Sequence, residues 1–170
     1  ASTKTNDTWA GISNSADAPV YHSAAFWGRA NSWYFFALVD ALEAMKNDKQ
    51  ENTENYKTLK NHLDSFAAGI VKWQDQTTGG WYQVMDEKGD YKASNYNSSY
   101  RWTTSYNNYI ETSATAIFSA ALFKAVRLGL LGDTYRGAAK KAFEGIVNNF
   151  VAPKADGTIN IWSSSRSAGL

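Results

Sequence analysis

The sequence predicts an all-α protein in which helical hairpins form part of a toroid, with two short strands added. Four segments carry apolar residues at helical spacing. These segments fall into two similar units, each made of two helices followed by a short strand. The length of 170 residues leaves room for one domain that buries roughly two-thirds of its unfolded surface.

The expected helices cover residues 28–45, 54–73, 111–128 and 133–150. In each of them apolar residues recur every three or four positions, as in a helix that buries one face. In the first helix the residues with this spacing are Trp33, Phe36, Ala37, Val39 and Leu42. In the fourth helix the residues expected to face inward are Tyr135, Ala139, Phe143, Ile146 and Val147.

The ends of these helices carry residues that commonly begin or end helices. Thr53 or Asn52 is expected to cap the second helix, and Asp133 the fourth. Gly129 suits the C-terminal end of the third helix. Pro153 is expected to stop the fourth.

Two short strands are expected, over residues 81–85 and 158–162. In the first strand Trp81 and Tyr82 alternate, so one of them faces inward and the other outward. The polar N-terminal stretch 1–25 and the Tyr/Asn/Ser-rich stretch 91–108 are expected to be loops.

The two units resemble each other weakly. Gly69-Ile70-Val71 matches Gly145-Ile146-Val147 at an offset of 76 residues, and the stretch 80–84 matches 157–161 at an offset of 77. Repeated units of this kind bury their apolar faces against one another, and stable arrays usually contain about three or more. Two units therefore predict a portion of a larger helical toroid.

Composition argues against several functional classes. The chain has 17 basic and 16 acidic side chains, so it lacks the concentrated basic charge typical of nucleic-acid binders. It has no cysteine and only two histidines, which argues against a thiolate or histidine-rich metal centre. No apolar run reaches about 18 residues, so no membrane span is expected. We expect a soluble protein, with the compartment (cytoplasm, periplasm or outside the cell) left open.

The stretch Phe26–Asp40 contains the candidate binding site. It places Trp27, Arg29, Asn31 and Trp33 within seven residues at the start of an apolar helix. An arginine between indole rings offers planar hydrogen-bond donors beside stacking faces, which suits a carboxylated ring such as an acidic sugar. The alternative is that the tryptophans belong to the core, the arginine is solvated and the asparagine occupies the first helical turn.

Two further groups of residues have two interpretations each. Glu111 stands just before an Ala/Ser-rich helix, where a carboxylate suits the positive helix end, and a role in the site is the alternative to capping. The residues Tyr96, Tyr100, Arg101 and Trp102 either line a sugar groove or pack their loop onto the helices.

Three stretches in order resemble motifs of the unsaturated rhamnogalacturonyl hydrolases, glycoside hydrolase family 105. They are Phe-Trp-Gly-Arg-Ala-Asn-Ser-Trp at 26–33, Gly-Trp-Tyr-Gln-Val-Met-Asp at 80–86 and Asn-Tyr-Ile-Glu-Thr-Ser-Ala at 108–114. The third stretch continues into Lys-Ala-Val-Arg-Leu-Gly at 124–129. The likeness covers about residues 9–170.

The resemblance implies that residues 1–170 are a portion of a single (α/α)6-barrel catalytic domain, cut at both ends. Such enzymes remove a Δ4,5-unsaturated uronic acid from the non-reducing end of oligosaccharides that a polysaccharide lyase has produced. The resemblance implies vinyl-ether hydration by an aspartic acid without a cofactor or metal. The remainder of the barrel is then a required partner.

Carried onto this chain, the resemblance places Trp27, Arg29 and Trp33 at substrate-contacting positions. Ala30 stands where the family often has a polar residue. The catalytic aspartate lies upstream of the motif in the family, so the general acid is expected outside this chain. The alternatives are a uronide-binding module without catalysis and a helical scaffold for a protein partner.

Overall fold

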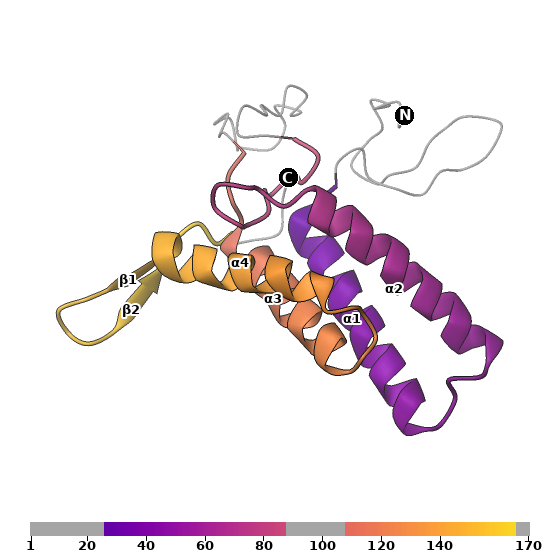
Figure 1. The fold of residues 1–170 in the computed structure, drawn as a ribbon. Helices are drawn as coiled ribbons and strands as arrows, with labels where there is room; N and C mark the ends of the chain where they lie inside the picture. Colours follow the sequence, from indigo (N-terminus) through magenta and orange to yellow (C-terminus); the bar gives the residue numbers. More distant parts are fainter. Residues whose placement is uncertain (1–25, 88–107, 166–170) are drawn as a thin grey trace, which may run out of the picture.

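The computed structural model describes residues 26–87 and 108–165, which form four helices and a two-stranded hairpin (Figure 1). The elements are α1 (Gly28–Asn47), α2 (Glu54–Lys72), α3 (Thr112–Arg127), α4 (Thr134–Phe150), β1 (Val151–Pro153) and β2 (Ile159–Ile161). The predicted all-α class and its four helices are confirmed. The expected loop 1–25 and nearly all of the loop 91–108 lie outside the described residues.

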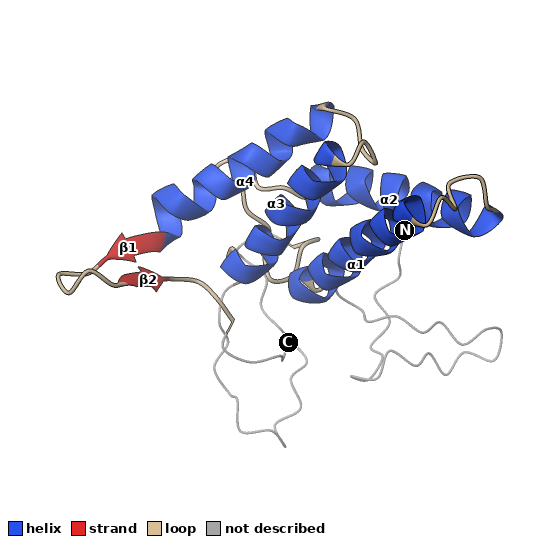
Figure 2. Ribbon diagram, turned by 90° about the horizontal axis from the view of Figure 1, so that it is seen from below, coloured by secondary structure: helices blue, strands red, loops and turns tan. Residues whose placement is uncertain are grey.

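The helices form two hairpins, α1 with α2 and α3 with α4 (Figures 1 and 2). Helices α1 and α3 pack against each other, while α2 packs on α1 and α4 packs on α3. The strand pair β1–β2 extends from the end of α4. The first turns of α1 and α3 consequently lie near each other at one end of the helices.

The core fills the space between the two hairpins. Phe35 of α1 and Phe118 of α3 are fully buried, with ring centroids 6.1 Å apart. Trp81 is also fully buried, its ring centroid lies 4.9 Å from that of Phe118, and its Nε1 donates to the Ile70 carbonyl at 2.7 Å. Tyr82 is only half-buried, so Trp81 is the one of these two aromatics that faces the core, although residues 83–85 are buried as well and the segment does not alternate.

The helix ends agree with the sequence except at one position. The Thr53 hydroxyl accepts from the Tyr56 amide at 3.2 Å, and Gly129 follows α3 with a φ of 71°. Asp133 occupies the N-cap position of α4 as predicted, but its carboxylate accepts from Arg136 at 2.7 Å and makes no capping hydrogen bond. Helix α4 ends at Phe150, as predicted. Pro153, the residue expected to stop the helix, lies three residues further on, within β1.

The two predicted strands have different outcomes. Residues 159–161 form β2, which pairs antiparallel with β1. The strand predicted at 81–85 is absent, because this segment makes single bridges to two different segments: Tyr82 bridges Ile110 and Val84 bridges Trp27. Residues 81–85 therefore form no continuous β-ladder with either of these segments.

The predicted inward faces were wrong at several positions. In α1 the buried apolar side chains are Phe35, Leu38, Val39 and Leu42, whereas Trp33 and Ala37 are exposed. In α4 Phe143 and Val147 are exposed, and the buried residues are Ala139, Ala142 and Gly145. A Cβ at Gly145 would collide with the Thr78 carbonyl, so α4 turns its small residues inward to allow this close approach.

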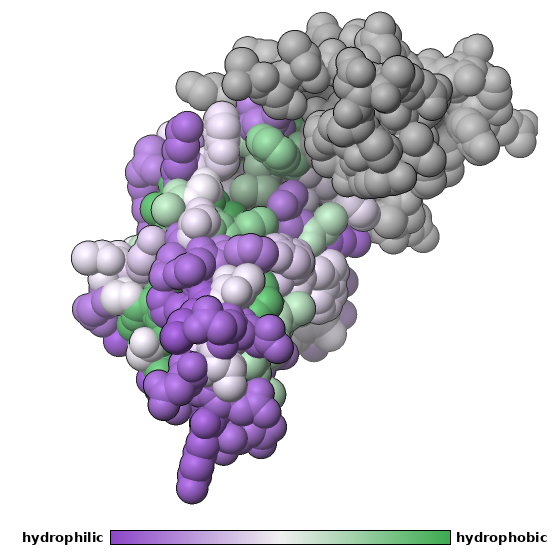
Figure 3. Space-filling view, turned by 90° about the vertical axis from the view of Figure 1, so that its right-hand side faces the viewer, coloured by the Kyte–Doolittle hydropathy of each residue, from purple (hydrophilic) through white to green (hydrophobic). Residues whose placement is uncertain are grey.

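The surface on the α2 side is largely hydrophilic, with smaller apolar patches between the polar side chains (Figure 3). The exposed residues of α2 include Lys57, Asn61, His62 and Asp64. Within residues 26–87 and 108–165, no helix has both the length and the apolar character needed to cross a bilayer.

Candidate functional site

The first turns of α1 and α3 are held together by the chain segments that precede α3. The Gly28 amide donates to the Gln83 carbonyl at 2.9 Å, and the Gln83 amide donates to the Tyr109 carbonyl at 2.8 Å. The Glu111 amide donates to the Trp81 carbonyl at 2.8 Å. Backbone bonds therefore place Arg29, one residue into α1, beside the residue that precedes α3.

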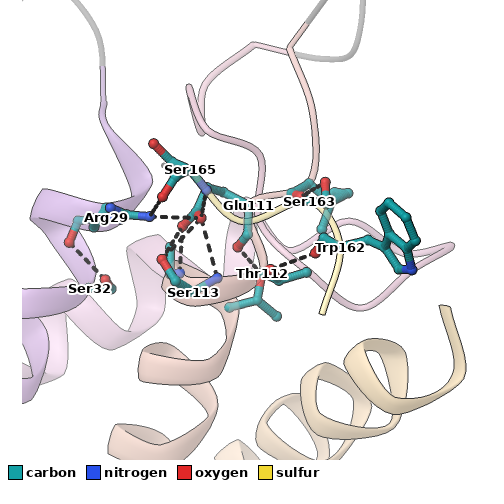
Figure 4. Close-up of polar contacts among 11 residues, drawn as sticks. Arg29, Ser32, Glu111, Thr112, Ser113, Trp162, Ser163 and Ser165 are labelled. Atoms are coloured by element: carbon teal, nitrogen blue, oxygen red, sulfur yellow. Dashed lines mark hydrogen bonds and ion pairs between the residues drawn. The ribbon is translucent and has the colours of Figure 1, made fainter. Parts of the chain in front are cut away.

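The Glu111 carboxylate is the centre of this arrangement (Figure 4). It is fully buried, and its Oε2 accepts from the Ala114 amide at 2.7 Å and from the Ser113 hydroxyl at 2.8 Å. Its Oε1 accepts from the Ser165 amide at 2.9 Å and from Arg29 Nη2 at 3.2 Å. Glu111 therefore caps α3, as predicted, and also binds two residues outside that helix.

Burial raises the pKa of Glu111, but the hydrogen bonds from Ser165, Ala114 and Ser113 and the charge of Arg29 outweigh it. The net effect lowers the pKa of Glu111 below its ordinary value. The carboxylate is therefore ionised at neutral pH and acts only as a hydrogen-bond acceptor.

The Arg29 guanidinium is fixed at one of its nitrogens. Nη2 donates to Glu111 Oε1 at 3.2 Å and to the Ser165 carbonyl at 2.8 Å. A guanidinium carries five N–H donors, so those on Nε and Nη1 remain. Within the described part of the chain the buried Nε has no hydrogen-bond partner. An anchored guanidinium with remaining donors suits recognition of a carboxylate.

A short segment after β2 closes the network from the other side. The Thr112 amide donates to the Ser163 carbonyl at 3.0 Å, and the Thr112 hydroxyl donates to the Trp162 carbonyl at 2.9 Å. The Ser163 hydroxyl donates to the Ile110 carbonyl at 2.6 Å. These bonds hold residues 162–165 against the start of α3, which brings Ser165 to Arg29 and Glu111.

The other predicted site residues lie along the first two turns of α1. Trp33 is 60% exposed and stands one turn after Arg29, so it is not a core residue. Trp27 is half-buried, and its indole Nε1 has no partner among the described residues. The side-chain amide of Asn31 donates to the Trp27 carbonyl at 2.8 Å. This bond fits the alternative interpretation of Asn31 as a residue of the first helical turn. Binding of a sugar by these residues stays a prediction.

Glu111 and Asp40 are both already engaged. Glu111 accepts hydrogen bonds on both oxygens, and Asp40, about three turns beyond Arg29 on α1, pairs with Lys124 at 2.7 Å. Among the residues that the structure describes, no group of three His, Cys, Asp or Glu side chains could hold a metal ion. Neither carboxylate is therefore free of partners, and the donors on Arg29 Nε and Nη1 are the groups of this network left for a ligand.

Two members of the network were missed by sequence reasoning. Ser165 contributes its backbone amide and carbonyl, and no side-chain pattern indicates such a role. Ser113 donates through its hydroxyl to Glu111, and only the Glu-Thr-Ser sequence at the start of α3 indicated such a contact. Glu111 itself was assigned chiefly to capping, because a single glutamate before a helix does not reveal a partner 82 residues away.

Comparison with known proteins agrees with this description. The model of Glycosyl Hydrolase Family 88 matches residues 4–170. Protein Atu3128 of Agrobacterium fabrum is 38% identical over 120 residues, which are 71% of this chain and 41% of that protein. The chain thus spans less than half of that relative.

Solved structures are similar in fold. A family 105 glycoside hydrolase of C. acetobutylicum has a TM-score of 0.72 and 32% identity to this chain. The match covers 95% of this chain and 39% of the C. acetobutylicum chain. A possible family 105 member from Salmonella enterica has a TM-score of 0.67 and 28% identity to this chain. The match covers 91% of this chain and 34% of the Salmonella chain. The (α/α)6-barrel type of fold and the resemblance to family 105 are confirmed, and the chain belongs to glycosyl hydrolase family 88.

Proposed function

We propose that this chain supplies the carboxylate-binding side of a glycoside hydrolase site for Δ4,5-unsaturated uronic acids. The observation that carries the proposal is that Arg29 and Trp33 lie four residues apart, on one face of α1. Arg29 is anchored at Nη2 by Glu111 and retains other donors, and Trp33 presents an exposed indole one turn away. A guanidinium on the ligand carboxylate and an indole against the sugar ring are complementary to a uronic acid.

The reaction that fits this substrate class is hydration of the vinyl ether. A proton is added at C4 and the hydroxyl of water at C5, which gives a hemiketal. The hemiketal opens to a ketone at C5, and the hemiacetal left at C1 releases the rest of the oligosaccharide. One carboxyl group can act first as acid and then as base, and no cofactor is consumed. We expect this group to be an aspartate outside the chain.

The proposed domain is larger than the chain. Residues 1–170 would be a portion of one (α/α)6 catalytic domain, and the remainder of the barrel would be its partner. Support comes from the exposed apolar side chains on α4 and the hairpin. Those that are more than 45% exposed are Phe143, Val147, Ile159, Ile161 and Trp162. Ile159 and Ile161 lie opposite Pro153 and Val151 in the ladder, so one face of the hairpin is wholly apolar.

The test is turnover of an unsaturated uronic disaccharide by the full-length natural protein that carries this sequence. Loss of the vinyl-ether absorbance reports the reaction directly. Trp33→Ala should raise KM about fivefold or more, since stacking on an aromatic ring contributes on the order of 1–3 kcal/mol. Phe143→Ala, which truncates an aromatic on α4 that the rest of the barrel would cover, is the control for loss of an aromatic away from the site and should leave KM near its original value. Absence of both turnover and binding in the unaltered protein would refute the proposal.

A second function is a uronide-binding module without catalysis. The observation that favours it is that Glu111 and Asp40 are both engaged and so are poorly placed to donate a proton. Binding of the disaccharide with no loss of absorbance would identify this module. The third possibility, a protein-binding scaffold that uses Tyr96, Tyr100 and Trp102, concerns residues outside the described ranges.

A further inference from the structure

In the second unit, one face of α4 is covered by the turn at residues 74–79, which follows α2 in the first unit. The Gln74 side chain donates from Nε2 to the Ala138 carbonyl at 2.9 Å. Lys141 donates from Nζ to Gln76 Oε1 at 2.8 Å. The contact is therefore made largely by polar groups of the turn and by the backbone and side chains of α4.

The approach of this turn to α4 is too close for larger residues. A Cβ at Gly145 would collide with the Thr78 carbonyl, and a Cβ at Gly79 would collide with the Lys141 carbonyl. Gly79 also has a φ of 75°, which side chains rarely adopt. Glycine at both positions lets the backbone of the turn lie directly on the helix.

The internal repeat gives α2 the same face. The repeat aligns Gly69 with Gly145, 76 residues later, and it aligns Leu63 with Ala139. The side chains of Leu63 and Ala139 are both fully buried. At this offset the residues of α2 that correspond to Ala138, Lys141 and Gly145 are His62, Ser65 and Gly69, here named the α2 docking face.

The α2 docking face is uncovered. All three of its residues are exposed, whereas Gly145 is buried and Ala138 and Lys141 are half-buried. Within the described part of the chain, no atom lies within 4 Å of a Cβ built at Gly69. No described residue is close enough to require a glycine at position 69. A glycine within a helix lowers the stability of the helix by about 1 kcal/mol relative to alanine.

We propose that the α2 docking face binds the glycine-containing turn of another helix–helix–turn unit, the one that would precede α1 in a closed toroid. Its occupant would contact α2 as the turn 74–79 contacts α4, through backbone and polar side chains. The hydrophilic character of the α2 side suits such a contact (Figure 3). This inference rests on the part of the proposed function that assigns the chain to a larger barrel, which the 39% coverage of the related C. acetobutylicum structure supports.

The first test compares two helical glycines in the full-length natural protein that carries this sequence. Gly137 is the matched control, because it is exposed on α4 and also has no described atom within 4 Å of a built Cβ. Gly137→Gln should raise the melting temperature by about 1–2 °C through better helix propensity. Gly69→Gln should lower the melting temperature, because its side chain would occupy the place of the docked turn. An equal rise for both variants would overturn the inference.

A second test uses small changes that cannot block folding of the helix. The thiols introduced by Ser65→Cys and Asn61→Cys are compared by their alkylation rates in the native full-length protein. Both positions are exposed in the structure, but only Ser65 belongs to the α2 docking face. We expect several-fold slower alkylation at Ser65→Cys, and equal rates would overturn the inference. Neither test uses a sugar, so failure of the proposed activity is detected separately.

Discussion

Arg29 and Glu111 join the first turns of α1 and α3 through a 3.2 Å ion pair, and the backbone of Ser165 bridges both members. The Glu111 side chain is fully buried, whereas that of Arg29 is 20% exposed. Removing two charges from water is costly, and extra hydrogen bonds of the kind seen here are needed to offset that cost. The pair is thus sensitive to loss of either partner.

Glu111→Ala should lower the free energy of unfolding by about 3–5 kcal/mol, because it leaves Arg29 without its buried counter-ion and α3 without its cap. Urea unfolding followed by circular dichroism measures the change. Glu54→Ala is the control: Glu54 is 86% exposed and pairs with Lys57 on the helix surface, so its loss should cost less than about 0.5 kcal/mol. Equal costs for the two variants would contradict the role given to Glu111.

Glu111→Asp should separate capping from positioning. Aspartate is a favoured N-cap residue, but its shorter side chain does not reach Arg29 and Ser113 Oγ together. We expect the selectivity for an unsaturated uronic acid over its methyl ester to fall by about tenfold or more, as loss of a charged hydrogen bond would produce. Calorimetric titration of both ligands measures this ratio. Unchanged selectivity would mean that Glu111 acts on the fold alone.

The stability should depend on the ionisation of Glu111. Its folded-state pKa lies below its ordinary value of 4.5, so the stabilisation is present at higher pH and is lost as the pH falls through the folded pKa. Urea midpoints between pH 7 and pH 3 should therefore fall more steeply for the unaltered protein than for Glu111→Gln. Parallel curves for the two proteins would show that Glu111 does not titrate with unfolding.

The two tryptophans of the motifs should respond differently to truncation. Trp81→Ala should cost about 3–5 kcal/mol, because the indole is fully buried and donates to the Ile70 carbonyl. Trp33→Ala should cost less than about 1 kcal/mol, since its side chain is 60% exposed. Chemical unfolding of both variants decides the matter, and a large loss at Trp33 would place that residue in a core.

Gly28→Ala tests how closely α1 approaches the segment before α3. A Cβ at this position would lie 2.8 Å from the Tyr82 carbonyl, so the backbone must shift. We expect a loss of about 1–3 kcal/mol, the usual cost of overpacking. Gly132→Ala, where the nearest described atom is 3.8 Å from a built Cβ, should be close to neutral. A neutral Gly28→Ala would show that the two segments can separate freely.

Helix positions could be predicted because apolar spacing and end residues are local properties. Thr53 and Gly129 act at helix ends through bonds or backbone angles within a few residues, so the sequence alone was informative. The inward face of α4 could not be predicted in this way. It depends on the close approach of Thr78 to Gly145, a contact between segments that are distant in the sequence.

The candidate site shows the same division. Trp27, Arg29 and Trp33 were selected because they are close in the sequence and chemically unusual. The partners of Arg29 lie 82 and 136 residues away, and one of them, Ser165, acts through its backbone alone. Backbone groups are common to every residue, so composition and spacing carry no information about them.

The segment 162–165 also has a consequence for how the molecule assembles. A ribosome makes Arg29 long before it makes Ser165, and 136 residues separate the two. During synthesis Arg29 and Glu111 can meet, but the Ser165 carbonyl and amide that complete their hydrogen bonds do not yet exist. Contacts between such distant segments form late because of their loop-closure entropy. During synthesis the guanidinium therefore obtains its full set of hydrogen-bond partners only after the sequence of all four helices has been made.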